Sequence, residues 1–384
     1  MRFTVFTHVL HKNRKTEYFG YAPYIREMNL WLKQFEEVEI VAPKDSNPVS
    51  AAEISYRHQN LSFLEVSSFN LLSVQGSFRA ILRIPGIAIK IYKAMKRADH
   101  IHLRCPGNIG LIACFVQLFF PKKPKTAKYA GNWDPNAKQP WSYRLQKWIL
   151  GNTFLSRNMK VLIYGEWAGQ NKNIIPFFTA SFSEKELPVP EKDFKKPFLF
   201  LFVGNLVEGK RPLQAIKLVE KLRERNFPVT LGIYGDGILK KDLEKYCRDN
   251  KLSAFVHFKG NQPLDKLKKG YKKAHFLVLL SKSEGWPKAV AEAMFFGCVP
   301  IATPVSCVPW MLDDGKRGVL LEESEGAMGR QDDGEKGRER DFATERIINL
   351  LKNPMEMKRK SMAAMEWSQK YTLEKFEEEI KEVS

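Results

Sequence analysis

The regular alternation of strand and helix patterns in the second half of the chain constrains its fold more than any other feature. Apolar runs of strand length recur there about every 20 to 30 residues, and amphipathic helical patterns lie between them. Continuous apolar strands joined by such helices predict a parallel sheet that is covered on both faces. The predicted strands lie at residues 198–206, 229–235, 255–261, 276–281, 299–303 and 318–322.

The first half of the chain shows the same kind of pattern. Short β-branched or aromatic runs predict strands at residues 2–9, 38–43, 100–106, 126–132 and 160–167. The opening run therefore predicts a first strand and not a cleaved signal peptide. The fold class predicted for the whole chain is α/β, with a doubly wound domain in each half.

A change of composition marks the boundary between the two halves. After Phe182 the pattern stops, and "SEKELPVPEKDFKKP" follows, rich in proline and charge as an exposed linker would be. We therefore expect domains at 1–191 and 192–384, which suits a chain of 384 residues. Two such domains would define a cleft between the carboxyl ends of two sheets, where open α/β folds bind ligands.

The net charge of +19 is concentrated in the first domain. Residues 51–150 contain 15 Lys and Arg against 4 Asp and Glu, so 15 − 4 = 11 of the excess charges lie there. A basic surface of this kind attracts the phosphates of nucleic acid, anionic lipid or a phosphorylated substrate. A surface that only keeps the protein in solution remains an equal alternative.

Hydropathy and cysteine usage indicate a cytoplasmic protein. The longest apolar candidate, residues 109–120, is too short to span a bilayer. The five cysteines form no CxxC pair and leave an odd one over, which argues against a disulfide framework and against a structural zinc site.

The loop "VGNLVEGKRP" (203–212) is a near miss of a nucleotide-binding P-loop. Gly204, Gly209 and Lys210 match G-x-x-x-x-G-K, but Arg211 and Pro212 stand where the Ser or Thr that binds magnesium and the start of the helix should be. A P-loop NTPase is therefore a distant hypothesis. The glycines, two cations and a helix start still predict an anion site, with a plain strand-to-helix turn as the alternative.

Two carboxylates flank a turn in the stretch "SEGWPKAVAEAM" (283–294). Pro287 opens and Gly297 closes an apolar helix, in which Lys288 and Glu292 are the polar exceptions, spaced i, i+4. A solvated ion pair is one interpretation of them. Glu284 lies before the helix, after a strand, so that Glu284 and Glu292 together could accept hydrogen bonds from several hydroxyls of a sugar or ribose.

Glu284 and Glu292, with seven residues between them, resemble the E-x7-E signature of retaining GT-B glycosyltransferases of the family 4 or group 1 type. Further segments stand in that family's order and spacing. They are "VGNLVEGKRP", "IYGDGILKKDLEKYC", "VHFKGNQP", "HFLVLLSKSEGWPKAVAEAMFFGCVPIAT" and "DDGKRGVLL".

The resemblance implies transfer of a sugar from a UDP- or GDP-linked donor to a saccharide or lipid-linked acceptor, with retention of configuration, in surface polysaccharide or glycan biosynthesis. It implies no metal, no other cofactor and no nucleic-acid partner. Its fold has two Rossmann-like domains facing each other across a cleft, and we expect the C-terminal helices to pack back toward the first domain.

The resemblance also assigns roles to residues. Glu292 would bind the ribose hydroxyls, Glu284 the donor sugar near the reacting centre, and Lys210 the leaving diphosphate, as a catalytic cation. The other candidate donor-binding residues are Gly204, Asn205, Arg211, Gly285, Trp286, Pro287, Lys288, Lys259 and Asn261.

The chain departs from the family pattern in three places. Asn205 replaces the usual arginine after the strand glycine, so Arg211 or Lys288 would have to supply the second charge. The N-terminal loop has Gly20 where a glycine pair is usual, and the loop that often holds a histidine has Asn132, Trp133 and Asp134. His102, expected at a strand end, is a tentative cleft residue with a structural role as the alternative.

The segment "RIPGIAIKIYKAMKRADH" (83–100) carries Lys90, Lys93, Lys96 and Arg97 on an apolar helix. It predicts peripheral contact with the inner face of a membrane and thereby a lipid-linked acceptor, with a core-facing helix as the alternative. The rival function is a catalytically silent nucleotide- or nucleic-acid-binding protein that uses the basic cleft.

Overall fold

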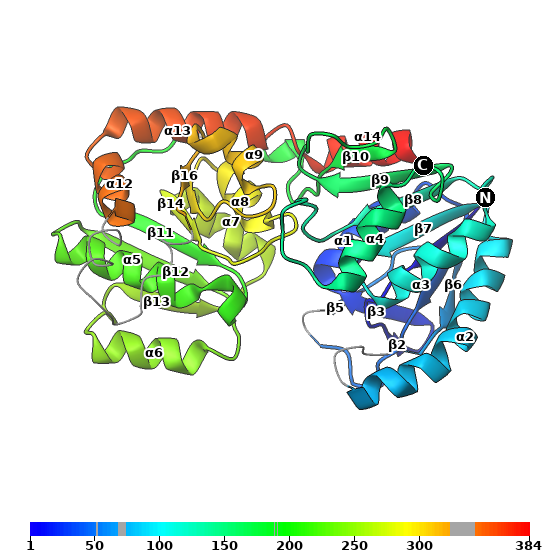
Figure 1. The fold of residues 1–384 in the computed structure, drawn as a ribbon. Coiled ribbons are helices and arrows are strands. Elements are labelled where there is room, and N and C mark those ends of the chain that lie inside the picture. Colours follow the sequence, from blue (N-terminus) through cyan, green and yellow to red (C-terminus); the bar gives the residue numbers. More distant parts are fainter. Residues whose placement is uncertain (51–52, 68–73, 188, 190, 323–341) are drawn as a thin grey trace. The chain divides into compact units, whose positions relative to one another are not determined.

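The chain divides into two α/β units by its internal contacts. Unit 1 comprises residues 1–179 and 375–384, and unit 2 comprises residues 180–374. The computed structural model describes all residues except 51–52, 68–73, 188, 190 and 323–341 (Figure 1). The predicted boundary at residue 191 falls between the first residue of unit 2 and its first strand. Pro188 and Pro190, which contributed to the linker prediction, lie outside the described residues.

Unit 1 is built on a parallel sheet of seven strands. Its order is β10-β9-β8-β7-β1-β4-β6. The strands are β10 (Ile174–Phe177), β9 (Met159–Tyr164), β8 (Lys125–Tyr129), β7 (His100–Cys105), β1 (Arg2–Phe6), β4 (Glu37–Ala42) and β6 (Leu61–Glu65). The five strands predicted for this half are all present, as β1, β4, β7, β8 and β9.

Helices cover both faces of this sheet, because successive side chains of its strands point to opposite faces and both faces are largely apolar. Ile101 and Leu103 of β7 pack in one core with α2 (Val74–Arg97), α3 (Asn108–Val116) and α4 (Trp141–Gly151). His102, between them, faces the opposite side, where its ring lies 4.7 Å from that of Trp31 in α1 (Ala22–Leu32). A doubly covered parallel sheet results, as the pattern predicted.

The last helix, α14 (Leu373–Val383), returns to unit 1, as expected, whereas α12 (Phe342–Leu351) and α13 (Pro354–Ser368), which were expected to do the same, belong to unit 2. The Phe376 ring lies 5.5 Å from the rings of both Phe177 and Phe178. Lys128 of β8 is fully buried beside them, with its ammonium 4.2 Å from the Phe177 ring centre and 5.9 Å from that of Phe376. This apolar and cation–π contact fixes where the helix docks.

Unit 2 is a parallel sheet of six strands in the order β13-β12-β11-β14-β15-β16. The strands are β13 (Val256–Gly260), β12 (Val229–Tyr234), β11 (Phe198–Val203), β14 (Phe276–Leu279), β15 (Val299–Ala302) and β16 (Val319–Leu320). All six coincide with the predicted strands. The helices are α5 (Pro212–Glu224), α6 (Lys240–Asp249), α7 (Leu264–Lys273), α8 (Lys288–Phe295), α9 (Val308–Leu312), α12 (Phe342–Leu351) and α13 (Pro354–Ser368).

A small antiparallel sheet, β2-β3-β5, was not predicted. It consists of β2 (Lys12–Arg14), β3 (Glu17–Tyr21) and β5 (Glu53–Ser55). These strands are three to five residues long and mostly polar, so they carry no apolar period that would mark them. Gly20 lies within β3, where an added Cβ would come within 3.0 Å of the Ile25 side chain.

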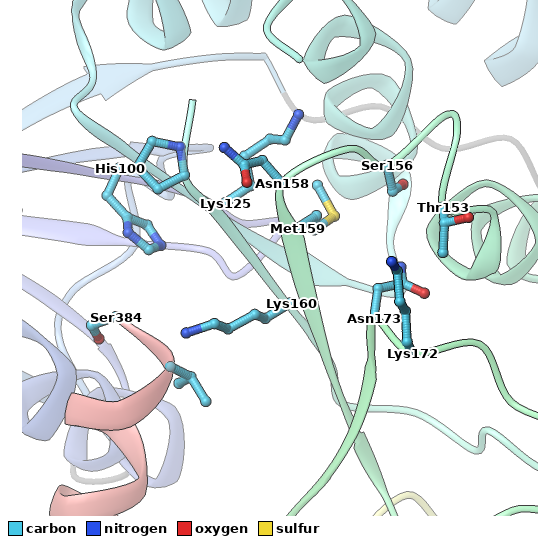
Figure 2. Close-up of a pocket in the computed structure, with 12 residues that line it drawn as sticks. His100, Lys125, Thr153, Ser156, Asn158, Met159, Lys160, Lys172, Asn173 and Ser384 are labelled. Atoms are coloured by element: carbon cyan, nitrogen blue, oxygen red, sulfur yellow. The ribbon is translucent and has the colours of Figure 1, made fainter. Parts of the chain in front are cut away.

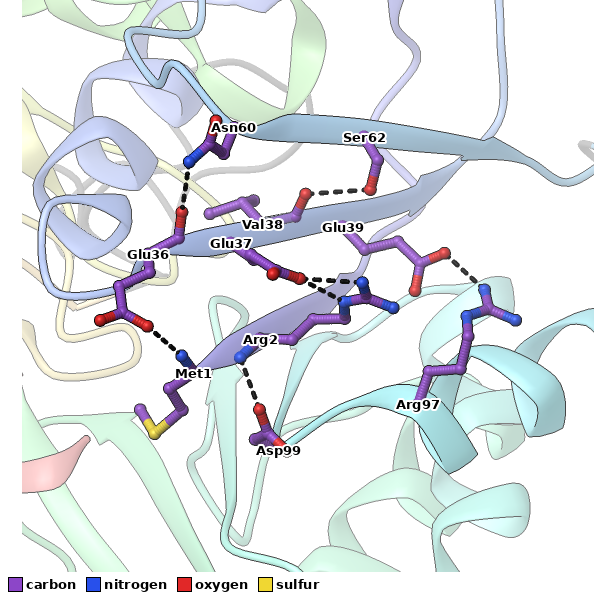
Figure 3. Close-up of polar contacts among 10 residues, drawn as sticks. All are labelled: Met1, Arg2, Glu36, Glu37, Val38, Glu39, Asn60, Ser62, Arg97 and Asp99. Atoms are coloured by element: carbon purple, nitrogen blue, oxygen red, sulfur yellow. Dashed lines mark hydrogen bonds and ion pairs between the residues drawn. The ribbon is translucent and has the colours of Figure 1, made fainter.

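Polar side chains tie together β1, β4 and β6 near their amino-terminal ends (Figure 3). The Arg2 guanidinium pairs with Glu37 at 2.8 Å, and its backbone N–H donates to Asp99 at 2.7 Å. Arg97, the last residue of α2, pairs with Glu39 of β4 at 2.5 Å. Arg97 is one of the four basic residues on which the predicted membrane contact rests, and it therefore forms an ion pair within unit 1.

Buried neutral histidines predict that unit 1 loses stability in mild acid. Burial lowers the pKa of His11 and of His100 to about 4 from an ordinary 6.5, and lowers the pKa of His102 well below 6.5. The unfolded chain therefore takes up protons first as the pH falls, so stability is full above pH 6.5 and is lost progressively toward pH 4. A pKa shift of this size corresponds to about 3 kcal/mol per histidine.

Urea unfolding at pH 7.5 and pH 5 measures this loss. We expect a clear drop in the midpoint for the wild-type protein and a smaller drop for His100→Gln, which keeps a polar side chain beside Thr126, the hydrogen-bond partner of His100. A wild-type midpoint that is the same at both values would contradict the prediction.

Candidate functional site

Two loops meet at the carboxyl-terminal edge of the unit 2 sheet. The first follows β11 and the second follows β14, and these strands are neighbours in the sheet. The backbone N–H of Lys282 donates to the carbonyl of Gly209 at 2.8 Å, which joins the two loops. Because parallel neighbours end at the same edge, the two sequence motifs come together although they are more than seventy residues apart.

Lys210 and Glu284 form an ion pair across these loops. The Lys210 Nζ lies 2.5 Å from Oε1 of Glu284. The Glu284 side chain is 7% exposed and that of Lys210 is 30% exposed, so the carboxylate is held inside and the ammonium reaches solvent. The contact brings the two predicted catalytic residues together, and it leaves further N–H groups of Lys210 able to bind an anion.

Close backbone packing explains the glycines beside this pair. An added Cβ on Gly235, which follows β12, would lie 1.9 Å from the carbonyl oxygen of Gly204. One on Gly237 would lie 2.5 Å from the carbonyl oxygen of Leu206. The "GDG" stretch therefore shapes the loop after β11 through contact between backbones. Asn205, in the same loop, is exposed.

Arg211 and Pro212 form the junction between this loop and α5. Arg211 adopts the left-handed conformation, with φ of 49°, and caps the helix that Pro212 opens. The predicted helix start at Pro212 is confirmed, and the Arg211 side chain is partly exposed at it.

The turn after Glu284 is fixed by its tryptophan. Trp286 is buried, with its ring 6.3 Å from the rings of both Trp310 and Trp367 and 6.0 Å from that of Tyr371. The carbonyl of Gly285 accepts from the Ser306 hydroxyl at 3.1 Å. Trp286 thus acts as an anchor beneath the turn.

The helix α8 begins at Lys288, with Pro287 as its N-cap, as predicted. The backbone N–H of Lys288 donates to the Trp286 carbonyl at 2.8 Å. This amide is therefore occupied within the turn. The Lys288 side chain is partly exposed.

Glu292, one helical turn further on, accepts two hydroxyl hydrogen bonds. The Ser181 hydroxyl donates to Oε1 at 2.6 Å, and the Tyr271 hydroxyl donates to Oε2 at 2.9 Å. Burial raises the pKa of Tyr271 well above its ordinary value, so its proton stays in place as a donor. Glu292 is partly exposed, and the two bonds hold its carboxylate in a defined orientation.

Sequence reasoning missed Ser181 and Tyr271, which lie 111 and 21 residues from Glu292. No motif or spacing links them to it, because only the packing of α7 and of the segment before β11 against α8 brings them there.

Lys259 and Asn261 lie at the end of β13, the edge strand of the sheet, and both are exposed. The carbonyl of Lys259 accepts from the Gln262 side chain at 2.5 Å. The carbonyl of Gly260 accepts from the backbone N–H of Gly235 at 2.9 Å. This strand end is thereby tied to the glycine loop after β12.

The tentative residues of the first domain all belong to unit 1. Asn132, Trp133 and Asp134 follow β8 at the carboxyl-terminal edge of its sheet, where Asn132 Oδ1 accepts from the backbone N–H of Asp134 at 2.8 Å. Trp133 is buried and its Nε1–H donates to Gln170 at 3.0 Å. These contacts stabilise the loop itself.

His102 does not lie at a strand end, which corrects the prediction. It is the third residue of β7, fully buried, and its Nδ1 is 2.8 Å from the Thr126 hydroxyl. The strand continues through Leu103, Arg104 and Cys105, as the predicted strand at 100–106 already implied, so His102 lies inside it. The structural alternative holds for this histidine.

One further buried ion pair lies at the carboxyl-terminal edge of the unit 1 sheet and was not predicted. Arg104 of β7 pairs with Glu27 of α1 at 2.5 Å, with both side chains largely buried. In the described part of the chain, no group of three or more His, Cys, Asp or Glu side chains is placed to hold a metal ion.

Residues 183–328 match the model of the family described as "Glycosyl transferases group 1". This segment contains Lys210, Glu284 and Glu292, together with the loops that carry them.

Curated relatives match parts of the chain. An uncharacterized glycosyltransferase of Methanocaldococcus jannaschii is 29% identical over 192 residues, which are 50% of this chain and 48% of that protein. An α-1,4-N-acetyl-D-galactosaminyltransferase of Campylobacter jejuni, named for an undecaprenol diphosphate-linked saccharide, is 33% identical over 28% of this chain and 29% of its own length. A lipopolysaccharide 1,6-galactosyltransferase of Salmonella typhimurium is 31% identical over 35% and 37%. The chain thus spans about half or less of these relatives.

A solved structure resembles the chain over its full length. The HepE protein of Anabaena, solved in complex with UDP, superposes with a TM-score of 0.64 and 13% identity, covering 100% of this chain and 99% of that one. At this identity the likeness establishes the fold. The chain therefore has the two-unit GT-B fold, and its segment 183–328 matches the group 1 family of glycosyltransferases.

Proposed function

We propose that this protein is a retaining glycosyltransferase that moves a sugar from a nucleotide-sugar donor to a saccharide or lipid-linked acceptor, without a metal. The observation that carries the proposal is the Lys210–Glu284 ion pair, placed in the family segment, with Glu284 eight residues before Glu292. We assign the donor to unit 2 and the acceptor to unit 1, in surface polysaccharide or glycan biosynthesis at the cytoplasmic face of a membrane.

Lys210 would stabilise the charge that develops on the leaving diphosphate. The buried Glu284 carboxylate holds the ammonium at the edge of the sheet and offsets the cost of confining it there. A fixed cation or donor aimed at developing charge is typically worth roughly 2–4 kcal/mol of barrier. Arg211 or Lys288 would supply the second charge, since Asn205 is neutral.

Glu284 would contact the donor sugar through the oxygen that does not face Lys210, as the acceptor hydroxyl replaces the diphosphate at the anomeric carbon. Glu292 would accept from the ribose hydroxyls. Its two hydrogen bonds to Ser181 and Tyr271 support this role, because they hold the carboxylate in a defined orientation.

The relatives support the choice of substrate class. HepE was solved with UDP, and the Campylobacter enzyme is named for a lipid-linked saccharide. UDP and GDP both remain in the proposal for this chain.

Substitution of Glu292 tests the donor site. We expect Glu292→Gln to raise the donor KM at least tenfold, because the amide accepts ribose hydroxyls less well than a carboxylate, while the kcat changes less. Glu224→Gln, at an exposed position at the end of α5, is the matched control and should leave both constants unchanged. Donor kinetics with each purified variant give the comparison, and a fully active Glu292→Gln would exclude the ribose role.

Membrane contact is proposed through a different surface from the one that the sequence indicated. The helix α2 buries Ile87, Ile91, Ala94 and Met95 in the unit 1 core and leaves Ile89 and Tyr92 exposed. The neighbouring layer instead exposes large aromatic side chains, with Phe119 at 72%, Phe154 at 70% and Trp148 at 61%. We call the exposed residues Phe115, Phe119, Trp141, Trp148 and Phe154 the aromatic surface.

Charge favours an anionic lipid bilayer as the partner of this surface. Residues 101–160 contain ten Lys and Arg, of which Arg104, Lys125 and Lys128 are buried, and Asp134 is their single acidic residue. Aromatic rings that enter the headgroup region together with surrounding cations are the usual means of peripheral attachment. No helix in the described ranges has the length and apolarity to cross a bilayer.

Vesicle flotation tests this contact. We expect the protein to bind phosphatidylglycerol vesicles, to be released by high salt, and to bind phosphatidylcholine vesicles poorly. The double variant Trp148→Ser/Phe154→Ser should lose most of the binding. The control, Ile238→Ser/Met355→Ser, removes exposed apolar side chains of unit 2 and should bind as the wild type does. Equal binding by both double variants would contradict the proposal that the aromatic surface contacts the membrane.

A further inference from the structure

A pocket lies at the amino-terminal edge of the unit 1 sheet, the edge opposite to the strand ends at which α/β folds usually bind ligands. Its volume is about 350 Å³, which falls in the range of small-molecule sites. It is formed where β7, β8, β9 and β10 begin, and the end of α14 closes one side (Figure 2). The family segment does not include any of its residues.

The lining of this pocket is basic. Lys125, Lys160 and Lys172 contribute their side chains, and no Asp or Glu is among the twelve lining residues. In the described part of the chain, none of these lysines forms an ion pair. The Lys125 Nζ donates to the Phe120 carbonyl at 2.9 Å and the Lys160 Nζ donates to the Glu382 carbonyl at 2.8 Å.

Lys125 is the most confined of the three. It is 2% exposed, and burial lowers its pKa to about 8. A buried ammonium without a carboxylate partner costs free energy, and a bound anion would offset that cost. The pocket is therefore electrostatically incomplete as it stands.

The side chain of Asn173 adds a second condition that a ligand of this pocket should meet. The Asn173 Nδ2 donates to the Leu150 carbonyl at 2.8 Å, whereas its Oδ1 is buried and has no partner among the described residues. A buried acceptor without a donor is unfavourable unless a ligand or water supplies one. The ligand that satisfies both requirements carries an anionic group for the lysines and a hydroxyl for Asn173.

We propose that this pocket is a second ligand site, separate from the donor site, and that it takes a small phosphate-bearing polyol. Such a group occurs in free sugar or glycerol phosphates and in the headgroups of anionic lipids. The pocket adjoins the aromatic surface, since the lining residue Thr153 is followed directly by Phe154. A bound phosphate would also link β8 and β9 to the end of α14.

Titration calorimetry with the whole protein tests the site. The probes are sn-glycerol 3-phosphate, inorganic phosphate, glycerol, and dihexanoyl phosphatidylglycerol and phosphatidylcholine below their micelle concentrations. We expect saturable binding of glycerol 3-phosphate or of dihexanoyl phosphatidylglycerol, and the tighter of the two identifies a free metabolite or a lipid as the source. Glycerol and phosphatidylcholine should not bind.

Charge-removing variants locate the binding. Lys160 and Lys172 are exposed, so Lys160→Gln/Lys172→Gln should fold normally and weaken binding at least tenfold. Lys138→Gln/Lys241→Gln, at exposed positions outside the pocket, should bind as the wild type does. The pocket variant should keep the wild-type affinity for nucleoside diphosphates, so that failure of this site and failure of the donor site are distinguishable.

Three results would overturn the proposal. The first is that no phosphate probe shows saturable binding. The second is that the pocket variant binds as tightly as the wild type. The third is that inorganic phosphate binds as tightly as glycerol 3-phosphate, which would remove the role of Asn173.

Discussion

The Lys210–Glu284 ion pair is the interaction on which the candidate site of unit 2 depends. The order β11-β14 in the sheet brings its two loops side by side, and the bond from Lys282 to Gly209 joins their backbones. The ion pair then sets where the ammonium points. Removing either partner would leave the other without its counter-charge, which is costly for Glu284 because it is nearly buried.

The surroundings of this pair are built to hold it still. Trp286 packs among three aromatic rings beneath the turn, and close contacts of Gly204, Gly235 and Gly237 fix the loop on the other side. Tyr271 and Ser181 orient Glu292. Groups that are fixed before a ligand arrives bind and stabilise charge with little reorganisation. The residues that hold the ion pair in place are mostly apolar or small.

The sequence predicted most of what depends on local pattern. The six strands described in unit 2 were predicted, most of them as apolar runs, and α8 was bounded correctly by Pro287 and Gly297, whose φ of 72° ends the helix. The likeness of the E-x7-E stretch to a known family predicted the group 1 match and the GT-B fold.

What sequence could not predict depends on tertiary packing. The small sheet β2-β3-β5 is short and polar, and the partners of Glu292 are distant in the chain. His102 was placed at a strand end although the predicted strand at 100–106 already enclosed it, and it is buried within β7. Likewise, α2 showed an apolar and a basic side, and only its packing reveals that the apolar side belongs to the core, which shifts the proposed membrane contact to the aromatic surface. The boundary at residue 191, the roles of the donor residues and the absence of a metal requirement stay predictions.

The most direct measurement of the central claim is a thermal-shift panel of UDP, GDP, ADP and CDP and their sugars, in EDTA, on the wild-type protein and on Lys210→Ala. Ligand binding raises the Tm by an amount that grows with the logarithm of the ligand concentration divided by its Kd. The account predicts that one nucleoside diphosphate and its sugar raise the Tm without a divalent metal, and that Lys210→Ala loses most of this shift. No shift with any nucleotide, together with salt-sensitive stabilisation by an oligonucleotide, would contradict it and favour a silent nucleic-acid-binding protein.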